Sequence, residues 1–324
     1  MKRSLISLVL VVLVTGVVAI DLSHAASKID FPQRGKVISV VVPLPAGGGN
    51  DLAARALAST LEKEIGATVQ VVNKVGAGGQ VGATALAQAK PDGYTLGYPT
   101  LSMVVITYLD PERQAAFDRK SFEPVAADVL VPIMLAVRAD SPYKTVKDLV
   151  EAAKAKPKTI KAGNGRMTQE QFVVLQLEKL TGAKFIFVGL EGGAPAVTAL
   201  LGGHTDVMPG NVVNFLPHVK SGALRVLGAF DSERSQYMPD VPTFEEQGYK
   251  LYSTSTRCYL APAGTPKEIV NALSAAIKKA MEHEDYKKKM DQMAFTRRYL
   301  GPQEVANMFG EMETQYKPLI ELAK

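Results

Sequence analysis

The sequence has very few of the residue types that cross-link small folds or act in catalysis. Its 324 residues include one cysteine, no tryptophan and four histidines. A single cysteine, Cys258, cannot form an internal disulfide, so the fold has to be stabilised by core burial. A hydrophobic content of 47% permits such a core. We expect Cys258, in a strand-like run, to be buried and inert; a reactive thiol is the alternative.

Motifs of common enzyme classes are also missing. No HExxH zinc motif, GxSxG nucleophile elbow or GxxxxGK[ST] phosphate loop occurs in the sequence. The glycines of Gly76–Gly82 are spaced as GxGxxxG, which differs from the GxGxxG of dinucleotide-binding loops. No pair of carboxylates is spaced for acid–base work. The sequence therefore predicts no enzyme, no cofactor, no metal site and no catalytic residues.

Charge of one sign is not in large excess, since the net charge is +5. The one dense basic run is Lys287-Lys288-Lys289, which we interpret as a solvated helix face. We find no basic stripe of the kind that contacts nucleic acid, and we expect no nucleic-acid partner.

The N-terminus carries the longest apolar run. Lys2 and Arg3 precede Leu5–Ile20, and Ser23-His24-Ala25 places small residues at positions −3 and −1 of a cleavage site. This pattern is typical of a secretory signal peptide over residues 1–25, and an uncleaved anchor is the alternative. We therefore expect an exported protein.

The rest of the chain alternates β-rich runs with helical stretches, which predicts an α/β fold with mixed, mainly parallel sheets. Its length exceeds what one core usually serves, so we expect two lobes with a ligand cleft between them. We interpret Phe122–Ala139 as the path into the second lobe and Ser253–Leu260 as the return path. The expected domains are residues 26–128 with 256–324 (a discontinuous domain 1) and residues 129–255 (domain 2).

Capping residues predict where several helices begin. Thr145 with Asp148, and Thr168 with Gln171, have the spacing of capping boxes. Residues 107–124 are polar and irregular, which indicates a surface connection. Expected strands are Val37–Val42, Val69–Val72, Thr95–Tyr98, Ile160–Ala162, Lys184–Val188, Asp206–Met208 and Leu224–Phe230. Expected helices are Leu52–Ile65, Val81–Ala89, Thr145–Ala155, Thr168–Leu180, Ala194–Leu201, Leu216–Ser221, Pro266–Met281 and 301–322.

The first candidate site is the glycine turn between the first strand and its helix. Such a turn exposes unpaired backbone N–H groups and the positive pole of the helix dipole, and glycines let a ligand come close. We expect N–H groups of residues 47–51 to bind one carboxylate; a purely structural turn is the alternative. Asp51 and Arg55 are spaced i,i+4 for an ion pair. The candidate lining is Leu44, Ala46, Gly47, Gly48, Gly49, Asn50 and Asp51, with Asn50 or Asp51 as the helix cap.

A second glycine loop, Gly163–Thr168, also ends at a helix N-terminus. Thr168 is either a cap alone or a cap that also offers its hydroxyl to the ligand. Arg166 either grips a second carboxylate in bidentate fashion, which favours a dicarboxylate, or is a solvated loop residue. The candidate lining of this loop is Asn164, Gly165, Arg166, Met167 and Thr168.

Two further positions are candidates by their place in the expected fold. Gly192 precedes a helix, and Asp206 and Asn211 lie about the end of a strand. Open α/β sheets place ligands beyond the carboxyl ends of their strands. Structural turns are the alternative for each.

Seven segments carry a resemblance that covers nearly the whole chain after residue 25. They are VPLPAGGGNDLAAR (42–55), VNKVGAGGQVG (72–82), KPDGYTL (90–96), APA (194–196), LGGHTD (201–206), PDVPT (239–243) and APAGTP (261–266). In this order they resemble the Bug family of solute-binding proteins, the extracytoplasmic component of tripartite tricarboxylate transporters.

The resemblance implies a periplasmic, two-lobe binding-protein fold of type II that closes on its ligand. Family members hold a carboxylate between the first strand–helix loop and the glycine loop of the second lobe, partly through waters. On this chain these are Leu44–Asp51 and Gly163–Thr168. The implied ligands are organic acids, including di- and tricarboxylates, aromatic acids and some amino acids. The implied partners are the two membrane subunits of the transporter, and we expect a monomer.

Two other functions stay open at this point. Some family members present their ligand to a membrane sensor kinase instead of a transporter. An exported enzyme is a third hypothesis, although no catalytic constellation supports it.

The chain departs from the family pattern at several positions. Asn73-Lys74 stands for Glu-Asn-Arg, Leu190-Glu191-Gly192 stands where Tyr-Lys-Gly is common, and Arg166 replaces a small polar residue. The tryptophan often found near the return strand is missing. Each change affects specificity, so the resemblance transfers no ligand identity.

Overall fold

The structure, a computed structural model, describes residues 31–190 and 192–324. The expected signal peptide and the departure at Glu191 lie outside the described residues. Within the described ranges, none of the helices combines the length and the apolar character that crossing a bilayer requires.

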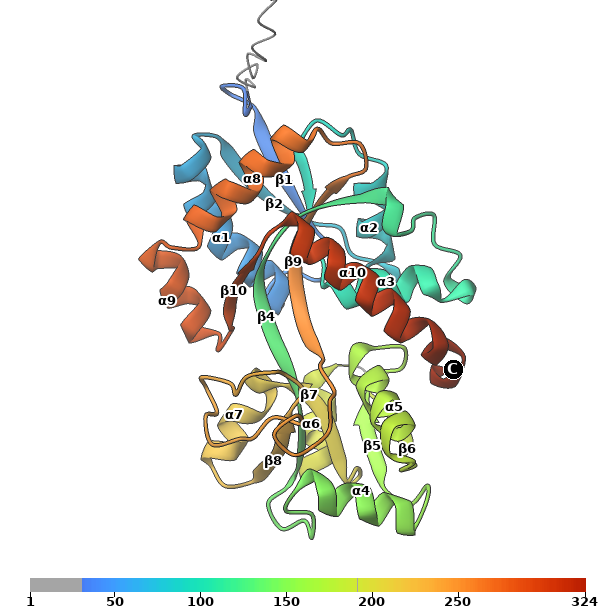
Figure 1. Cartoon of the computed structure of the whole chain (residues 1–324). Helices are drawn as coiled ribbons and strands as arrows, with labels where there is room; N and C mark the ends of the chain where they lie inside the picture. Colours follow the sequence, from blue (N-terminus) through green and yellow to red (C-terminus); the bar gives the residue numbers. More distant parts are fainter. Residues whose placement is uncertain (1–30, 191) are drawn as a thin grey trace, which may run out of the picture. The chain divides into compact units, whose positions relative to one another are not determined.

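A single long strand, β4 (Phe122–Arg138), links two groups of strands. Its first part pairs antiparallel with β9 (Thr254–Pro262). Its second part pairs antiparallel with β7 (Val207–Asn211) and β8 (Leu224–Ala229). β4 and β9 run side by side in Figure 1. The two expected connecting paths are therefore neighbouring strands.

The first strand group has the order β2-β1-β3-β9-β4, with β10 (Arg297–Leu300) paired to β4. β1 (Val37–Val42) pairs parallel with both β2 (Thr68–Asn73) and β3 (Thr95–Gly97). The β1 sequence VISVVV is rich in β-branched residues and largely buried, as is typical of a central parallel strand.

The second strand group has the order β4-β7-β5-β6, with β8 on β4. β5 (Lys161–Asn164) pairs parallel with β6 (Ile186–Gly189) and with β7. The sheets are thus mixed, as expected. Because β5 and β7 are parallel, their last residues, Asn164 and Asn211, end at the same edge of the sheet.

The expected caps at Thr145 and Thr168 are confirmed, whereas the expected cap at Asn50 or Asp51 is wrong, because α1 already begins at Gly49 after Gly48 as its N-cap. The Asp148 N–H donates to Thr145 Oγ1 and the Thr145 N–H donates to the Asp148 carboxylate. Thr168 Oγ1 accepts from the Gln171 N–H, but the Gln171 side chain accepts from the Met167 N–H at 2.7 Å instead of from the cap residue. The helices are α1 (Gly49–Ile65), α2 (Gln80–Ala87), α3 (Leu101–Leu109), α4 (Val146–Ala155), α5 (Gln169–Thr181), α6 (Gly193–Leu201), α7 (Val212–Lys220), α8 (Lys267–Ala280), α9 (Glu284–Gln292), α10 (Pro302–Tyr316) and α11 (Ile320–Ala323).

Helix α3 was not predicted, and its last residues fall where we expected an irregular connection. Its sequence LSMVVITYL has several β-branched residues, which are poor helix formers. Leu101, Val104 and Val105 are buried. Burial against the neighbouring elements stabilises this helix more than intrinsic propensity does.

The largest buried cluster spans both strand groups, since it also contains Met208 and Val226 of the second group, and a smaller cluster lies under the second group. Val40, Leu57 and Tyr259 lie in the largest cluster, and Leu135 and Leu149 lie in a cluster under the second group. Cys258 is buried in β9, as expected, and this burial raises the pKa of its thiol. An inert, hydrophobic role for this residue follows.

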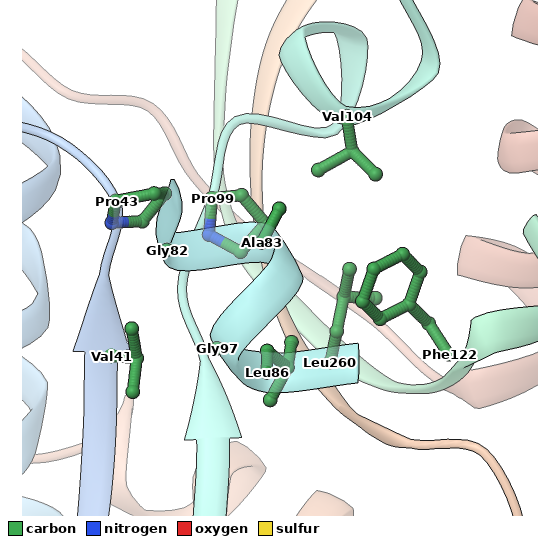
Figure 2. Close-up of a pocket in the computed structure, with 10 residues that line it drawn as sticks. All are labelled: Val41, Pro43, Gly82, Ala83, Leu86, Gly97, Pro99, Val104, Phe122 and Leu260. Carbon is green, nitrogen blue, oxygen red and sulfur yellow. The ribbon is translucent and has the colours of Figure 1, made fainter. Parts of the chain in front are cut away.

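Two glycines let α2 lie directly on the first strand group (Figure 2). A Cβ on Gly82 would lie 2.7 Å from Pro43 Cβ and 2.8 Å from the Lys74 carbonyl oxygen. A Cβ on Gly97 would lie 2.3 Å from Leu86 Cδ2. The apolar residues around them leave a cavity of only about 10 Å³. That volume is close to the minimum for one water, and an apolar lining keeps such a space dry.

We predict that Gly82→Ala lowers the free energy of unfolding by about 1–3 kcal/mol, because the added methyl overlaps packed backbone. Helix propensity alone predicts the opposite sign, since alanine is the better helix former by about 1 kcal/mol. Gly189→Ala is the matched control, with no atom within 4 Å of the added Cβ. Urea unfolding followed by circular dichroism measures both; equal losses in the two variants would contradict the close packing of α2.

Candidate ligand-binding site

A cavity of about 290 Å³ is lined by residues of both strand groups and their connections. Ligand pockets are typically about 300–1,000 Å³, so this one suits a small molecule. Its lining residues are Gly49, Asn164, Gly165, Thr168, Glu170, Gly192, Gly193, Ala196, Met208, Pro209, Gly210, Asn211, Val213, Asn214, Arg257 and Phe295.

The lining follows from the topology. Asn164 ends β5 and Asn211 ends β7, so both lie at the carboxyl edge of the second strand group. Gly49 begins α1, and Arg257 lies on β9 of the first group. The cavity therefore lies beyond the strand ends, where open α/β sheets bind ligands.

Arg257 is unusual among the cavity residues because it is charged and yet only 6% of its surface is exposed. Its Nε donates to Asn50 Oδ1 at 3.1 Å, and its guanidinium lies 4.0 Å from the centre of the Phe295 ring. A Cβ on Gly49 would lie 2.9 Å from Nη2, so the absence of a side chain there admits the guanidinium. Nη1 is buried and has no hydrogen-bond partner among the described residues.

The charge of Arg257 persists in this environment. Burial lowers the pKa of Arg257, and the fields of Tyr98, Asp128 and Tyr286 oppose that effect. Because the ordinary pKa of arginine exceeds 12, the guanidinium stays protonated at neutral pH. A buried cation with a donor left over is costly unless an anion or acceptor meets it.

Two more buried polar atoms of the cavity lack partners among the described residues. They are Asn164 Nδ2, a donor, and Asn211 Oδ1, an acceptor. Folded proteins leave few buried polar atoms unpaired. These three atoms belong to residues that line the same cavity.

Asn50 holds the arginine in place instead of lining the cavity. Its amide nitrogen donates to Thr100 Oγ1 at 3.2 Å and to the Tyr98 carbonyl at 3.4 Å, while its oxygen accepts from Arg257 Nε and from Thr100 Oγ1. Asn50 is itself buried. This network sets the direction of the guanidinium, because the side-chain amide is bonded at both ends.

A buried carboxylate, Asp128, acts on Arg257 through its electric field. Asp128 is the extra residue where the β4–β9 register shifts between Ala127 and Val129. A bulge of this kind changes the direction of a side chain, here that of Asp128. Tyr98 and Tyr286 hydroxyls donate to its two oxygens at 2.6 and 2.8 Å.

Asp51 is bonded to one end of the first glycine loop. The Gly47 N–H donates to Asp51 at 2.9 Å, and the expected Asp51–Arg55 ion pair is present at 3.0 Å. Burial raises the pKa of Asp51, but hydrogen bonds from Arg55, Gly47 and Asn73 outweigh it and hold that pKa below its ordinary value. The Gly48 N–H donates to a carbonyl of the same loop, that of Pro45.

The second glycine loop is divided between the cavity and the surface. Thr168 lines the cavity while its hydroxyl donates to the Gly165 carbonyl at 2.8 Å. Arg166 is exposed and donates to the Lys324 carbonyl, away from the cavity. Asp206 precedes β7, at the end opposite Asn211, and accepts from the Lys161 N–H at 2.8 Å.

The candidate residues thus fall into two sets. Those that line the cavity are Gly49, Asn164, Gly165, Thr168, Gly192 and Asn211. Those that do not are Leu44, Ala46, Gly47, Gly48, Asn50, Asp51, Arg166, Met167 and Asp206.

Sequence reasoning missed the two charged residues of the cavity, Arg257 and Glu170. An arginine inside the buried run Ser255–Leu260 was the available signal, because arginine is rarely buried without a partner. The described residues contain no cluster of three or more histidine, cysteine, aspartate or glutamate side chains that could hold a metal ion.

The buried carboxylate generates a pH prediction. Burial raises the pKa of Asp128 to about 6 from an ordinary 3.8, against the opposing effects of Tyr98, Tyr286 and Arg257. Between these values the folded state binds a proton that the unfolded state lacks, so stability falls as the pH rises. The loss of unfolding free energy is about 2.4 kcal/mol from pH 4 to pH 7.

Asp128→Asn removes this titrating carboxyl. All other titrating groups are present in both proteins, so their effects on stability cancel when the variant is compared with the natural protein. We predict that the unfolding free energy of the natural protein, minus that of Asp128→Asn, decreases by about 2.4 kcal/mol from pH 4 to pH 7. Urea unfolding at both pH values measures it. A difference that is independent of pH would show that Asp128 has an ordinary pKa.

Comparisons with known proteins identify the family of this chain. The family model described as the tripartite tricarboxylate transporter family receptor, TctC, matches residues 53–324. BugT from Bordetella pertussis is 32% identical over 255 residues, which cover 78% of each chain. The expected resemblance to the Bug family is therefore confirmed.

Solved structures share the fold. A TctC solute-binding protein from Polaromonas is 29% identical with a TM-score of 0.81, over 89% of this chain and 99% of that one. MatC from Rhodopseudomonas palustris, solved with bound malate, is 26% identical with a TM-score of 0.70, over 89% and 99% of the two chains. The expected two-lobe α/β fold is confirmed, and this chain belongs to the TctC (Bug) family of periplasmic solute-binding receptors.

Proposed function

We propose that this protein captures a small carboxylate in the cavity around Arg257 and delivers it to the membrane subunits of a tripartite tricarboxylate-type transporter. The observation that carries this proposal is the buried, protonated Arg257 whose Nη1 has no partner among the described residues. A carboxylate is the group that best matches a guanidinium in charge and geometry.

Two further features favour a carboxylate at this place. Asn164 Nδ2 offers a second unpartnered donor to the same cavity. Gly49 begins α1, so the positive pole of that helix lies beside the Arg257 guanidinium. The charge of Arg257, the Asn164 donor and the dipole of α1 thus all favour binding of an anionic group.

Closure of the lobes would complete the site. Gln169 at the start of α5 accepts from Ser102 Oγ of α3 at 2.9 Å, and Gln171 donates to the Ala323 carbonyl at 3.0 Å. These contacts and the cavity walls come from both strand groups, so a bound ligand would stabilise the arrangement in which they meet. The domain boundaries at residues 128/129 and 255/256 belong to the same proposal.

The transporter partnership rests on the family description, and export rests on the expected signal peptide over residues 1–25. The bound malate of MatC supports an organic acid as the class of ligand. Presentation of the ligand to a sensor kinase is the alternative. Adjacent genes for membrane transport subunits favour transport, and an adjacent kinase gene favours sensing.

We predict that Arg257→Gln weakens binding of the best acid by about 10- to 100-fold, because a hydrogen bond to a charged group contributes about 1.5–3 kcal/mol. The acid is first chosen by thermal shift from mono-, di- and tricarboxylates and amino acids, since a ligand of the folded state raises the midpoint. Isothermal titration calorimetry then measures the affinity of each variant.

Arg166→Gln is the matched control for loss of a positive charge. Because Arg166 lies outside the cavity, we expect an affinity within about twofold of the natural protein. A larger loss from Arg166→Gln than from Arg257→Gln would contradict the proposed carboxylate position and restore the dicarboxylate grip that the sequence suggested.

A further inference from the structure

We infer that Tyr237 is a positioning residue of the candidate site. Its hydroxyl, which comes from the second strand group, holds the turn that carries Phe295, and the Phe295 ring supports the Arg257 guanidinium. Tyr237 does not line the cavity, so it acts on a ligand through these two residues. The inference rests on the proposed function, in which Arg257 receives a carboxylate and the lobes close around it.

The Phe295 ring is the surface on which the Arg257 guanidinium lies. The ring centre is 4.0 Å from the guanidinium carbon, and only 4% of Phe295 is exposed. A Cβ on Gly49 would lie 3.1 Å from Phe295 Cζ and 2.9 Å from Arg257 Nη2, so ring and guanidinium both pack closely against the start of α1. Asn50 bonds the guanidinium at Nε, and the ring supports its face. A displaced ring would therefore change the direction of the guanidinium.

Phe295 lies in a turn between α9 and β10 that has an unfavourable backbone conformation. Ala294 has a φ of +50°, in the left-handed region that alanine seldom adopts. Such a residue keeps this conformation only where the surrounding structure holds it. The Phe295 N–H donates to the Met290 carbonyl at 3.0 Å, and the Thr296 carbonyl accepts from the Leu130 N–H at 3.0 Å. Both bonds come from α9 and β4, the elements next to the turn.

Tyr237 adds a bond to the same turn from a distant part of the chain. Its hydroxyl donates to the Phe295 carbonyl at 3.2 Å and to Asp291 Oδ1 at 3.1 Å. The Tyr237 side chain is half-buried. The hydroxyl thus holds the turn at the one residue whose ring meets Arg257.

The segment that carries Tyr237 belongs to the second strand group. It follows β8 and returns to it, since Thr243 forms a parallel bridge with Ala229. The Phe244 ring stacks on Phe230 at 3.7 Å, and both lie in the cluster under the second group. In contrast, β10 pairs with the first part of β4, beside β9. Separation of the lobes would therefore break the Tyr237 bond.

This bond couples closure of the lobes to the orientation of Arg257. When the lobes close, the hydroxyl reaches the turn and fixes the ring under the guanidinium. When they separate, the turn loses this restraint and the guanidinium loses its fixed direction, at the step in which a ligand leaves. Differences in affinity between variants of one site lie mostly in the rate of dissociation. Loss of the hydroxyl should therefore act mainly on ligand release.

We expect Tyr237→Phe to weaken binding by about three- to tenfold, because one hydrogen bond is lost, and to do so mainly by faster release. The probe is the tightest binder among acetate, benzoate, succinate, citrate and L-glutamate. Calorimetry measures its affinity, and surface plasmon resonance on the immobilised protein measures its release. Tyr94→Phe is the matched control, since this half-buried hydroxyl accepts from the Gln33 N–H, outside the cavity. We expect that control to change the affinity by less than about twofold.

Two further variants separate positioning from a simple fastening of the lobes. Asp291→Ala removes the other acceptor of the Tyr237 hydroxyl and leaves the Phe295 carbonyl, so the affinity should stay within about twofold of the natural protein. Phe295→Leu removes the ring and keeps the carbonyl. Tyr237→Phe added to Phe295→Leu should cost less than about twofold, because no ring remains to be positioned. A merely structural role of Tyr237 predicts the same loss in both backgrounds.

Three results would overturn the inference while the proposed function stands. They are an unchanged affinity in Tyr237→Phe, a loss in Asp291→Ala as large as that in Tyr237→Phe, and an undiminished effect of Tyr237→Phe in the Phe295→Leu background. If none of the acids binds the natural protein, the proposed function is wrong and the inference is wrong with it.

Discussion

The site depends on keeping one positive charge, that of Arg257, inside the protein. Burying a cation without an ion pair costs several kcal/mol. The fold offsets this cost with the Asn50 amide, the Phe295 ring and the field of Asp128, and none of these satisfies Nη1. A bound anion would supply the hydrogen-bond acceptor that Arg257 Nη1 lacks among the described residues.

The rest of the first lobe is arranged around that charge. The shared β4–β9 ladder carries Arg257 on one strand and, through a bulge, Asp128 on the other. Asp51 ties the glycine loop to Arg55, and the loop then presents Gly49, whose missing side chain admits the guanidinium. The glycine run is thus needed for packing against the arginine as well as for access to backbone N–H groups.

Much of this could be predicted from the sequence, and the missing part has a physical reason. The caps at Thr145 and Thr168 and the positions of most strands along the chain follow from local patterns. The contact between Arg257 and Asn50 spans 207 residues, so no local pattern reveals it. Asp51 was predicted among the ligand residues of the glycine loop, and its bonds to Gly47 and Asn73 could not be read from local patterns.

The most direct test of the account is a crystal structure of the protein with its tightest-binding acid. The account predicts a carboxylate oxygen within about 3 Å of Arg257 Nη1, with Asn50 still bonded to Nε. A carboxylate held instead by the loop of Gly47 and Gly48, with Arg257 Nη1 touching no ligand atom, would contradict it.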